Sequence, residues 1–226
     1  HSVNNRYGVC SNLEEFCEKA QLINLEDMKG MYEAWNDKMW DDATALLIWM
    51  SHPAYPSFVW QTYDYYRDPT GCYWGAKKAC EQQHVQWNCY NNSVKVINTT
   101  AEPLNNVRVK THIYDINGRE IFSQNSDRIS VEASNRADAL SLQLPKDQGV
   151  VFLRLELLDY KNYLISDNFY WTNCKNDYDY RELNNLPAAD VDCNVETVGE
   201  NELLLTLTNK SNTVAFAERI RMVNKK

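Results

Sequence analysis

Residues 52–66 bring together one histidine and many aromatic side chains, directly after a short apolar run at residues 45–50. The members of this group are His52, Tyr55, Phe58, Trp60, Tyr63, Tyr65 and Tyr66. Flat aromatic rings suit the apolar faces of sugars, so the group indicates a carbohydrate-binding surface. Any single ring is also explained by packing beneath a long loop, and a lone loop histidine is more often a solvated side chain than a catalyst.

The apolar run at residues 45–50 predicts the element that holds these side chains. It is too short for a globular helix, and acidic and polar residues flank it. Such a run is typical of a strand that is buried on both faces, as in parallel sheets. The carboxyl ends of parallel strands are where α/β folds place their ligand sites, and the aromatic group begins at that end.

Helices are predicted on both sides of this strand. Residues 12–40 repeat apolar side chains at helical spacing, with Ser11 or Asn12 as the N-cap and a possible break near Gly30. Residues 72–80 suit a second, short helix. A helix, a short acidic turn and a doubly buried strand together make half of a βαβ unit.

Residues 84–173 have a different pattern, in which short runs rich in Val, Ile, Leu and aromatic residues alternate with turn signals. The pattern predicts an antiparallel β-sandwich of about seven to nine strands, with Asn117-Gly118 as its strongest hairpin signal. The predicted strands are residues 84–88, 93–98, 107–115, 119–122, 128–131, 139–144, 150–159 and 164–171. The side chains expected to face inward are Val94, Val96, Val109, Ile113, Phe152, Leu155 and Phe169.

Residues 174–189 are polar and are interpreted as a linker, after which three strand-like runs follow at residues 190–198, 202–208 and 214–222. Three strands cannot close a sandwich. One helix and one buried strand cannot make a parallel sheet either, so the chain is expected to begin and end inside larger domains.

Composition excludes several classes of function. The formal net charge of −8 disfavours nucleic acid, and no apolar run reaches the roughly 18 residues that a membrane span needs. None of the seven cysteines is spaced as CxxC, so we predict no zinc ribbon, no metal site and no cofactor. No pair has the spacing of a disulfide framework, so we also predict that no disulfide forms.

The residues resemble the C-terminal half of glycoside hydrolase family 2 enzymes, in the branch of exo-β-D-glucosaminidases and mannosylglycoprotein endo-β-mannosidases. The resemblance covers nearly the whole chain. It is most specific in Trp60-Gln61-x-Tyr63-Asp64, Tyr73-x-Gly75-Ala76-Lys77-Lys78-Ala79-Cys80-Glu81 and His84-Val85-Gln86, and it extends to Tyr32-Glu33-Ala34-Trp35 and residues 45–49.

The resemblance implies a multi-domain, mainly β architecture. Residues 1–83 would be the last helix–strand–helix part of a (β/α)8 barrel, with residues 45–50 as its eighth strand. Residues 84–173 would be an immunoglobulin-like β-sandwich, and residues 174–226 a linker with the start of a second sandwich. Such enzymes are retaining glycosidases with an acid/base carboxyl group and a nucleophilic carboxylate. Both come from earlier barrel strands, so this chain is expected to hold no catalytic residue.

The resemblance also assigns candidate substrate-binding residues. Trp49 matches a tryptophan that helps to floor the sugar subsite, and Tyr55 falls where relatives have another aromatic residue. His52 is the third candidate, although the surrounding Ser51-His52-Pro53 departs from the family pattern and leaves the preferred sugar open. Asp64 is expected to fix its loop through backbone amides, and the pair Asn201-Glu202 imitates the family's acid/base dipeptide by chance.

The implied function is that of a fragment of a secreted or periplasmic β-glycosidase, or of one in a vacuolar or lysosome-like compartment. Its partners would be a β-linked glucosamine- or mannose-containing glycan and the remainder of the same enzyme. The alternative is a non-catalytic carbohydrate-binding or adhesive β-sandwich module. The helix–strand–helix pattern of residues 12–81 favours the glycosidase, because an adhesive module has no use for it.

Overall fold

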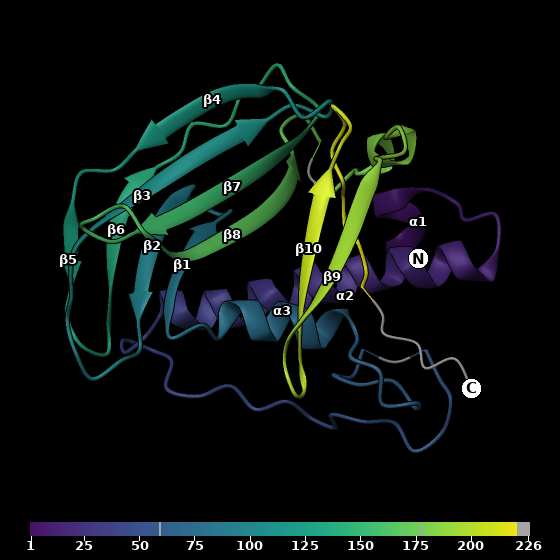
Figure 1. Ribbon diagram of the computed structural model, residues 1–226, viewed down its shortest axis with the longest axis horizontal. Helices are drawn as coiled ribbons and strands as arrows, with labels where there is room; N and C mark the ends of the chain where they lie inside the picture. Colours follow the sequence, from purple (N-terminus) through teal and green to yellow (C-terminus); the bar gives the residue numbers. More distant parts are fainter. Residues whose placement is uncertain (59, 177, 221–226) are drawn as a thin grey trace.

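The computed structural model of the chain describes residues 1–58, 60–176 and 178–220 (Figure 1). A helical layer lies along one side of a β-sandwich, and a separate β-hairpin stands beside both. The helices are α1 Ser2–Tyr7, α2 Leu13–Asp37, α3 Gly71–Ala79 and the 3₁₀ helix η1 Arg181–Asn185.

Helix α2 begins at the predicted cap. The side chain of Asn12 accepts a hydrogen bond from the backbone N–H of Glu15 at 2.9 Å, and the Glu15 carboxylate accepts one from the backbone N–H of Ser11 at 2.7 Å. The predicted break near Gly30 is wrong, because α2 continues through it to Asp37. One glycine costs a helix only about 1 kcal/mol, which the packing of the surrounding turns offsets.

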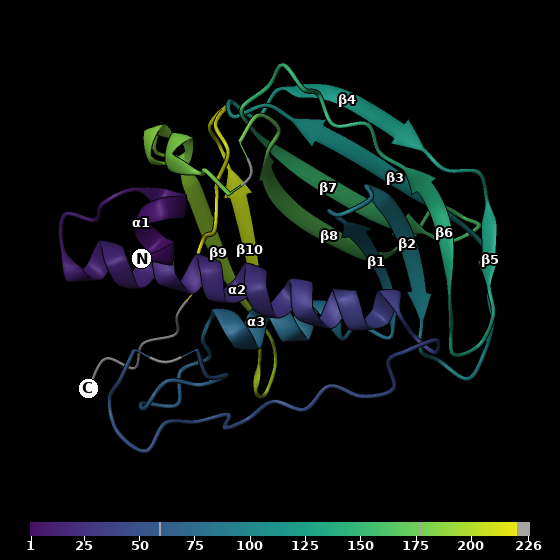
Figure 2. The ribbon, with the colours of Figure 1, turned by 180° about the vertical axis from the view of Figure 1, so that it is seen from behind.

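Helix α3 confirms the short helix expected at residues 72–80, and it packs against α2 at very close range (Figure 2). A Cβ atom added at Gly71 would lie 2.2 Å from the carbonyl oxygen of Gln21, and one at Gly75 would lie 2.4 Å from that of Leu25. Because Gly71 and Gly75 are one helical turn apart, α3 presents a face without side chains to the backbone of α2.

The strands of the sandwich confirm the predicted antiparallel pattern. One sheet has the order β1–β2–β6, and the other has the order β4–β3–β7–β8 with β5 paired to β3. The Asn117-Gly118 turn joins β3 to β4, with Gly118 at φ 79°, as the hairpin signal predicts. The bounds are β1 Gln83–Asn88, β2 Ser93–Asn98, β3 Leu104–Tyr114, β4 Glu120–Asn125, β5 Ile129–Val131, β6 Asn135–Ser141, β7 Val150–Leu158 and β8 Leu164–Asn173.

The core between the two sheets holds five of the side chains predicted to face inward: Val94, Val96, Val109, Ile113 and Leu155. The prediction is wrong for Phe152 and Phe169, whose rings stack 5.7 Å apart on the opposite face of the same sheet. Strand β7 is apolar at every position from 150 to 153, since both of its faces are covered. Alternation therefore could not assign a face to Phe152.

That opposite face forms a second core with the helices. Phe152 and Trp171 pack there with Val3 and Tyr7 of α1, Ile23 of α2 and Leu183 of η1. The indole N–H of Trp171 donates to the hydroxyl oxygen of Tyr7 at 3.1 Å. The sandwich and the helices therefore pack as one body.

Beyond the linker, two of the three predicted strands form, β9 Val191–Gly199 and β10 Glu202–Asn209, and they pair with each other as an antiparallel hairpin. The third predicted strand, at residues 214–222, is not formed over residues 214–220, and residues 221–222 lie outside the described part of the chain. Phe216 instead packs against Phe152 and Trp171, with ring centres 5.6 Å and 5.0 Å away. Packing against the second core replaces pairing with a neighbouring strand.

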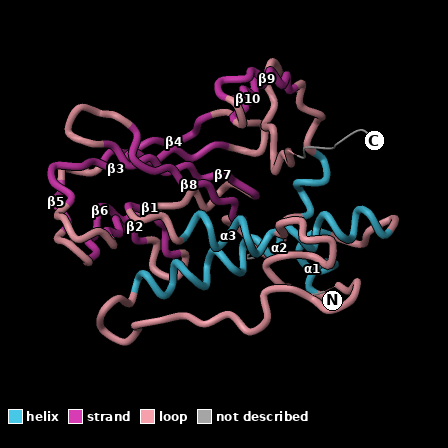
Figure 3. The backbone as a smooth tube through the Cα atoms, turned by 60° about the horizontal axis from the view of Figure 1, so that its bottom comes forward, coloured by secondary structure: helices cyan, strands magenta, loops and turns pink. Residues whose placement is uncertain are grey.

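The predicted strand at residues 45–50 is not formed either, and all strand pairings among the described residues are antiparallel. Residues 38–58 and 60–70 belong to a long connection beside the helices, which Figure 3 shows as a loop. A parallel strand needs neighbours for its backbone N–H and C=O groups, and the described residues supply none here. Residues 45–50 accordingly have no regular secondary structure and are largely exposed.

The seven cysteines, all within the described residues, have free thiols. Among the described helices, none combines the length and the apolar character that a bilayer span requires.

We predict that Gly75→Ala lowers the free energy of unfolding of this chain by about 1–3 kcal/mol, because the new methyl group overlaps the α2 backbone. The matched control is Gly30→Ala, where the new methyl group has no atom within 4 Å apart from those of its own stretch of α2. There the gain in helix propensity should stabilise the chain by about 0.5–1 kcal/mol. Urea unfolding of the two variants measures both effects, and equal midpoints would contradict the close packing of α3.

Candidate functional site

The residues predicted to bind substrate lie on the exposed connection between α2 and α3. Trp49 is 76% exposed and Tyr55 is 69% exposed, and His52 is also exposed. Phe58, Trp60 and Tyr66 are exposed on the same connection. Within the described residues, no hydrogen bond or ring contact joins Trp49, His52 and Tyr55 to one another. The structure thus places the three on one segment without assembling them into a closed site.

The far end of this segment is held by backbone contacts. The carboxylate of Asp64 accepts a hydrogen bond from the backbone N–H of Asp68 at 2.9 Å, which is the loop-fixing role predicted for it. The hydroxyl of Thr70 donates to the carbonyl oxygen of Gln61 at 2.6 Å. The backbone N–H of Tyr63 donates to the carbonyl oxygen of Ser51 at 3.0 Å, so the two sides of the aromatic group are tied together.

A buried polar network joins α2 to the sandwich and was not predicted from the sequence. One carboxylate oxygen of Glu33 accepts from the side-chain amide of Asn168 at 2.8 Å and from the hydroxyl of Tyr170 at 2.9 Å. The same oxygen lies 3.1 Å from Nε2 of His84. The ammonium group of Lys29 donates to the side-chain oxygen of Asn168 at 3.1 Å, and it lies 3.6 Å from the centre of the Tyr170 ring.

The sequence carries a signal for this network. Lys29, Glu33 and Asp37 stand four residues apart on α2, and all three are buried. His84 and Gln86 alternate with Val85 on β1, and the Gln86 amide donates to the carbonyl oxygen of Glu33 at 2.7 Å. Charged residues at helical spacing are ordinarily predicted to face solvent. Here the polar residues along one side of α2 face the polar residues of β1, and the two sets repeat at similar distances along the chain.

The network sets the protonation of its members. Burial acts to lower the pKa of His84, but its contacts with Glu33 and Glu81 outweigh burial and leave the pKa above the ordinary value. Burial acts to raise the pKa of Glu81, yet hydrogen bonds with His84, Lys78 and Ser166 hold it at about 2. His84 is therefore stabilised as a cation between two carboxylates.

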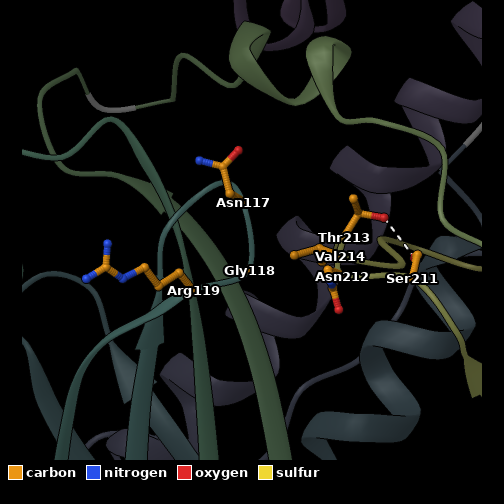
Figure 4. A pocket seen from close by; sticks show the side chains of 7 residues that line it. All are labelled: Asn117, Gly118, Arg119, Ser211, Asn212, Thr213 and Val214. Atoms are coloured by element: carbon orange, nitrogen blue, oxygen red, sulfur yellow. Dashed lines mark hydrogen bonds between the residues drawn. The ribbon is translucent and has the colours of Figure 1, made fainter.

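Two hollows are among those on the surface of the described residues. The first, of about 430 Å³, lies between the β3–β4 turn and residues 211–214, and is lined by polar side chains such as Asn117, Ser211 and Thr213 (Figure 4). The second, of about 330 Å³, lies between α2, α3 and β8 and is lined mainly by apolar groups, including Trp74 and Phe216. Neither contains a predicted site residue.

Neither hollow is equipped for glycoside hydrolysis, since the first has no carboxylate and the second has only Asp167. Glu202 lies exposed at the start of β10, paired to Gly199 in the hairpin. Within the described residues, no group of three or more His, Cys, Asp or Glu side chains has the arrangement of a metal site.

Two family models match this chain. The model of the mannosidase Ig/CBM-like domain covers residues 91–173, and that of the exo-β-D-glucosaminidase Ig-fold domain covers residues 168–226. Exo-β-D-glucosaminidase of Hypocrea jecorina is 30% identical over 98% of this chain. Mannosylglycoprotein endo-β-mannosidase of Lilium longiflorum is 30% identical over 96% of it. The chain spans 28% and 22% of the lengths of these two relatives.

Solved structures agree with this similarity. An exo-chitosanase of Amycolatopsis orientalis, in complex with PNP-β-D-glucosamine, matches 93% of this chain with a TM-score of 0.84 at 29% identity. The match covers 28% of that enzyme. A β-D-mannosidase of Dictyoglomus thermophilum has the same fold over 92% of this chain and 25% of its own length, with a TM-score of 0.73 at 22% identity.

The raised pKa values of His84 and Glu26 predict that these two groups contribute less stability as the pH rises, whereas burial lowers the pKa of Lys29, whose contribution has the opposite sign. Burial raises the pKa of Glu26 from 4.5 to about 7, against its contacts with Tyr7 and Arg6. A group whose pKa is higher in the folded state contributes stability that is lost as the pH rises through the folded value. The stability contributed by Glu26 is therefore lost between pH 4.5 and about pH 7, and that contributed by His84 is lost as the pH rises above 6.5.

Urea unfolding between about pH 5 and about pH 9 tests this prediction. Compared with the wild type, His84→Gln should remove a decrease in the free energy of unfolding from the upper part of the range, and Glu26→Gln should remove one from the lower part. The assignment is contradicted if both variants have the same pH dependence of stability as the wild type.

Proposed function

Because the homologues of this chain are glycoside hydrolases of family 2, of which it spans only a part, we propose that it is the C-terminal part of a retaining β-glycosidase. The proposed substrates are glycans with β-linked glucosamine or mannose. The substrate classes in the names of its relatives support this proposal: β-D-glucosamine for the fungal and actinobacterial enzymes, and β-mannose for the plant enzyme.

The exposed segment between α2 and α3 is the observation that carries the proposal. Leu47 is 93% exposed although it lies in an apolar run, and Trp49 follows it in the open. Exposed apolar surface of this kind marks an interaction site. The neighbouring strands of a (β/α)8 barrel, supplied by the rest of the enzyme, would cover residues 45–50 on both faces. Residues 1–83 would then complete the barrel with its last helix, strand and helix.

The chemistry of hydrolysis would come from outside this chain. A retaining glycosidase needs a proton donor and a nucleophilic carboxylate about 5–5.5 Å apart, and earlier barrel strands would carry both. This chain would contribute Trp49, Tyr55 and His52 to the substrate side of the barrel, where the loops after all eight strands meet. An indole under a pyranose ring excludes water and stabilises the charged transition state.

The proposed location is secreted or periplasmic, or a vacuolar or lysosome-like compartment, where polymeric glycans are accessible. The sandwich and the β9–β10 hairpin would be accessory domains of the same enzyme.

The chain on its own is expected to have no glycosidase activity, since it lacks both barrel carboxylates. Chromogenic β-glucosaminides and β-mannosides at millimolar concentration should be cleaved no faster by the purified chain than by buffer. Turnover above that background, abolished by heating the sample, would falsify the proposed division of roles.

In the intact enzyme, Trp49→Ala should reduce kcat/KM by roughly 30- to 900-fold, corresponding to about 2–4 kcal/mol of transition-state binding. The matched control is Tyr90→Ala, which removes a 95% exposed ring from the β1–β2 turn and should leave kcat/KM unchanged. Near-normal kcat/KM for Trp49→Ala would show that the indole does not contact the substrate.

A further inference from the structure

The sandwich contacts the start of the exposed segment directly through hydrogen bonds. The guanidinium group of Arg136, on β6, donates to the carbonyl oxygen of Met39 and to the carboxylate of Asp41, the latter at 2.6 Å. The indole N–H of Trp40 donates to the carbonyl oxygen of Ser134 at 2.6 Å. Three consecutive positions at the beginning of the segment thus have at least one contact with the loop and strand at residues 134–136.

The helix that precedes the segment is anchored to the same sheet. The ammonium group of Lys95, on β2, lies 2.8 Å from a carboxylate oxygen of Asp37, the last residue of α2. Both side chains are largely buried, with 14% and 10% exposed. Strand β2 pairs with β6, so Lys95 and Arg136 act from neighbouring strands on the end of α2 and on the residues after it.

Arg136 is suited to fix a backbone direction. Its planar guanidinium presents several donors in a rigid fork, so binding a carbonyl oxygen and a carboxylate together restricts orientation as well as distance. Its side chain is only 21% exposed, and Met39 beside it is buried. An isolated exposed ion pair contributes little to stability, and the value of this contact lies in geometry instead.

We infer that Arg136 is a positioning residue for substrate binding, an inference that rests on the proposed function. By holding Met39 and Asp41, it fixes the direction in which the chain leaves α2 toward Trp49, eight residues after Asp41. The sandwich thereby contributes to the substrate site without touching the substrate. Displacing a binding group by about 1 Å can cost roughly 100-fold in rate, so a contact at this distance from the sugar can matter.

The test uses the intact enzyme with Arg136→Ala and Asp41→Ala, each in the wild type and in the Trp49→Ala background. Asp41 is 64% exposed on its side chain, so its replacement removes the ion pair without disturbing the sandwich core. The control is Arg154→Ala, which removes an arginine that is 45% exposed and paired with Glu156 on β7. The readouts are kcat/KM on p-nitrophenyl β-D-glucosaminide and β-D-mannoside, Tm, and limited proteolysis of residues 38–70.

We expect Arg136→Ala to lower kcat/KM by about 10- to 100-fold and Asp41→Ala to lower it in the same direction. Cleavage within residues 38–70 should accelerate, while Arg154→Ala changes neither quantity. In the Trp49→Ala background the loss caused by Arg136→Ala should shrink to about twofold or less, because a residue that acts through Trp49 has no effect once the indole is absent.

Other outcomes overturn the inference in distinguishable ways. If Trp49→Ala impairs the enzyme but Arg136→Ala and Asp41→Ala do not, the positioning role alone is refuted. Fully multiplicative losses also refute it, since they show independent action. If Arg136→Ala fails to fold, Asp41→Ala decides by the same criteria. If the intact wild-type enzyme cleaves neither glycoside, the proposed function is wrong and the role of Arg136 falls with it.

Discussion

The buried carboxylate of Glu33 constrains the whole assembly. It is 4% exposed, and an unpaired charge at such a depth would cost several kcal/mol. It is tolerated because Asn168, Tyr170 and His84 converge on a single oxygen. These bonds are directional, so α2 has one position along the sheet in which all of them form. An apolar contact of the same area would tolerate sliding, whereas this one does not.

From that fixed position the remaining elements follow. Gly71 and Gly75 let α3 pack directly against the backbone of α2. The orientation of α3 therefore depends on that of α2, which the polar network fixes. The segment between the two helices starts at the end of α2 and returns to the start of α3, and its ends are therefore fixed by the same joint. The sandwich therefore affects the connection between α2 and α3 in two ways: through these helices, which lie between most of the connection and the sheets (Figure 2), and through its direct contacts with residues 39–41.

Local pattern predicted most of the secondary structure and little of this joint. Period-2 alternation identified the strands of the sandwich, and the cap at Asn12 identified the start of α2. Phe152 was misassigned because β7 is covered on both faces, which erases alternation. The strand expected at residues 45–50 depends on neighbours that these residues do not carry. The network was missed because Lys29, Glu33 and Asp37 satisfy the pattern of a solvated face, and only the facing strand reveals their burial.

The contact between α2 and the sandwich is polar, although an apolar contact would be enough for stability. Replacing buried ion pairs by well-packed apolar groups is often neutral or stabilising, so stability does not explain the network. The orientation of α2 does explain it. His84, Gln86 and Asn168 form hydrogen bonds that fix the position of α2 to within about 0.5 Å, and a substrate site requires the same accuracy. The segment that would place Trp49 against a sugar needs that accuracy at its start, where it leaves α2. The buried network and Arg136 therefore serve the same purpose. The network fixes the position of α2 in the interior through directional hydrogen bonds, and Arg136 fixes the start of the segment that carries the exposed aromatic residues.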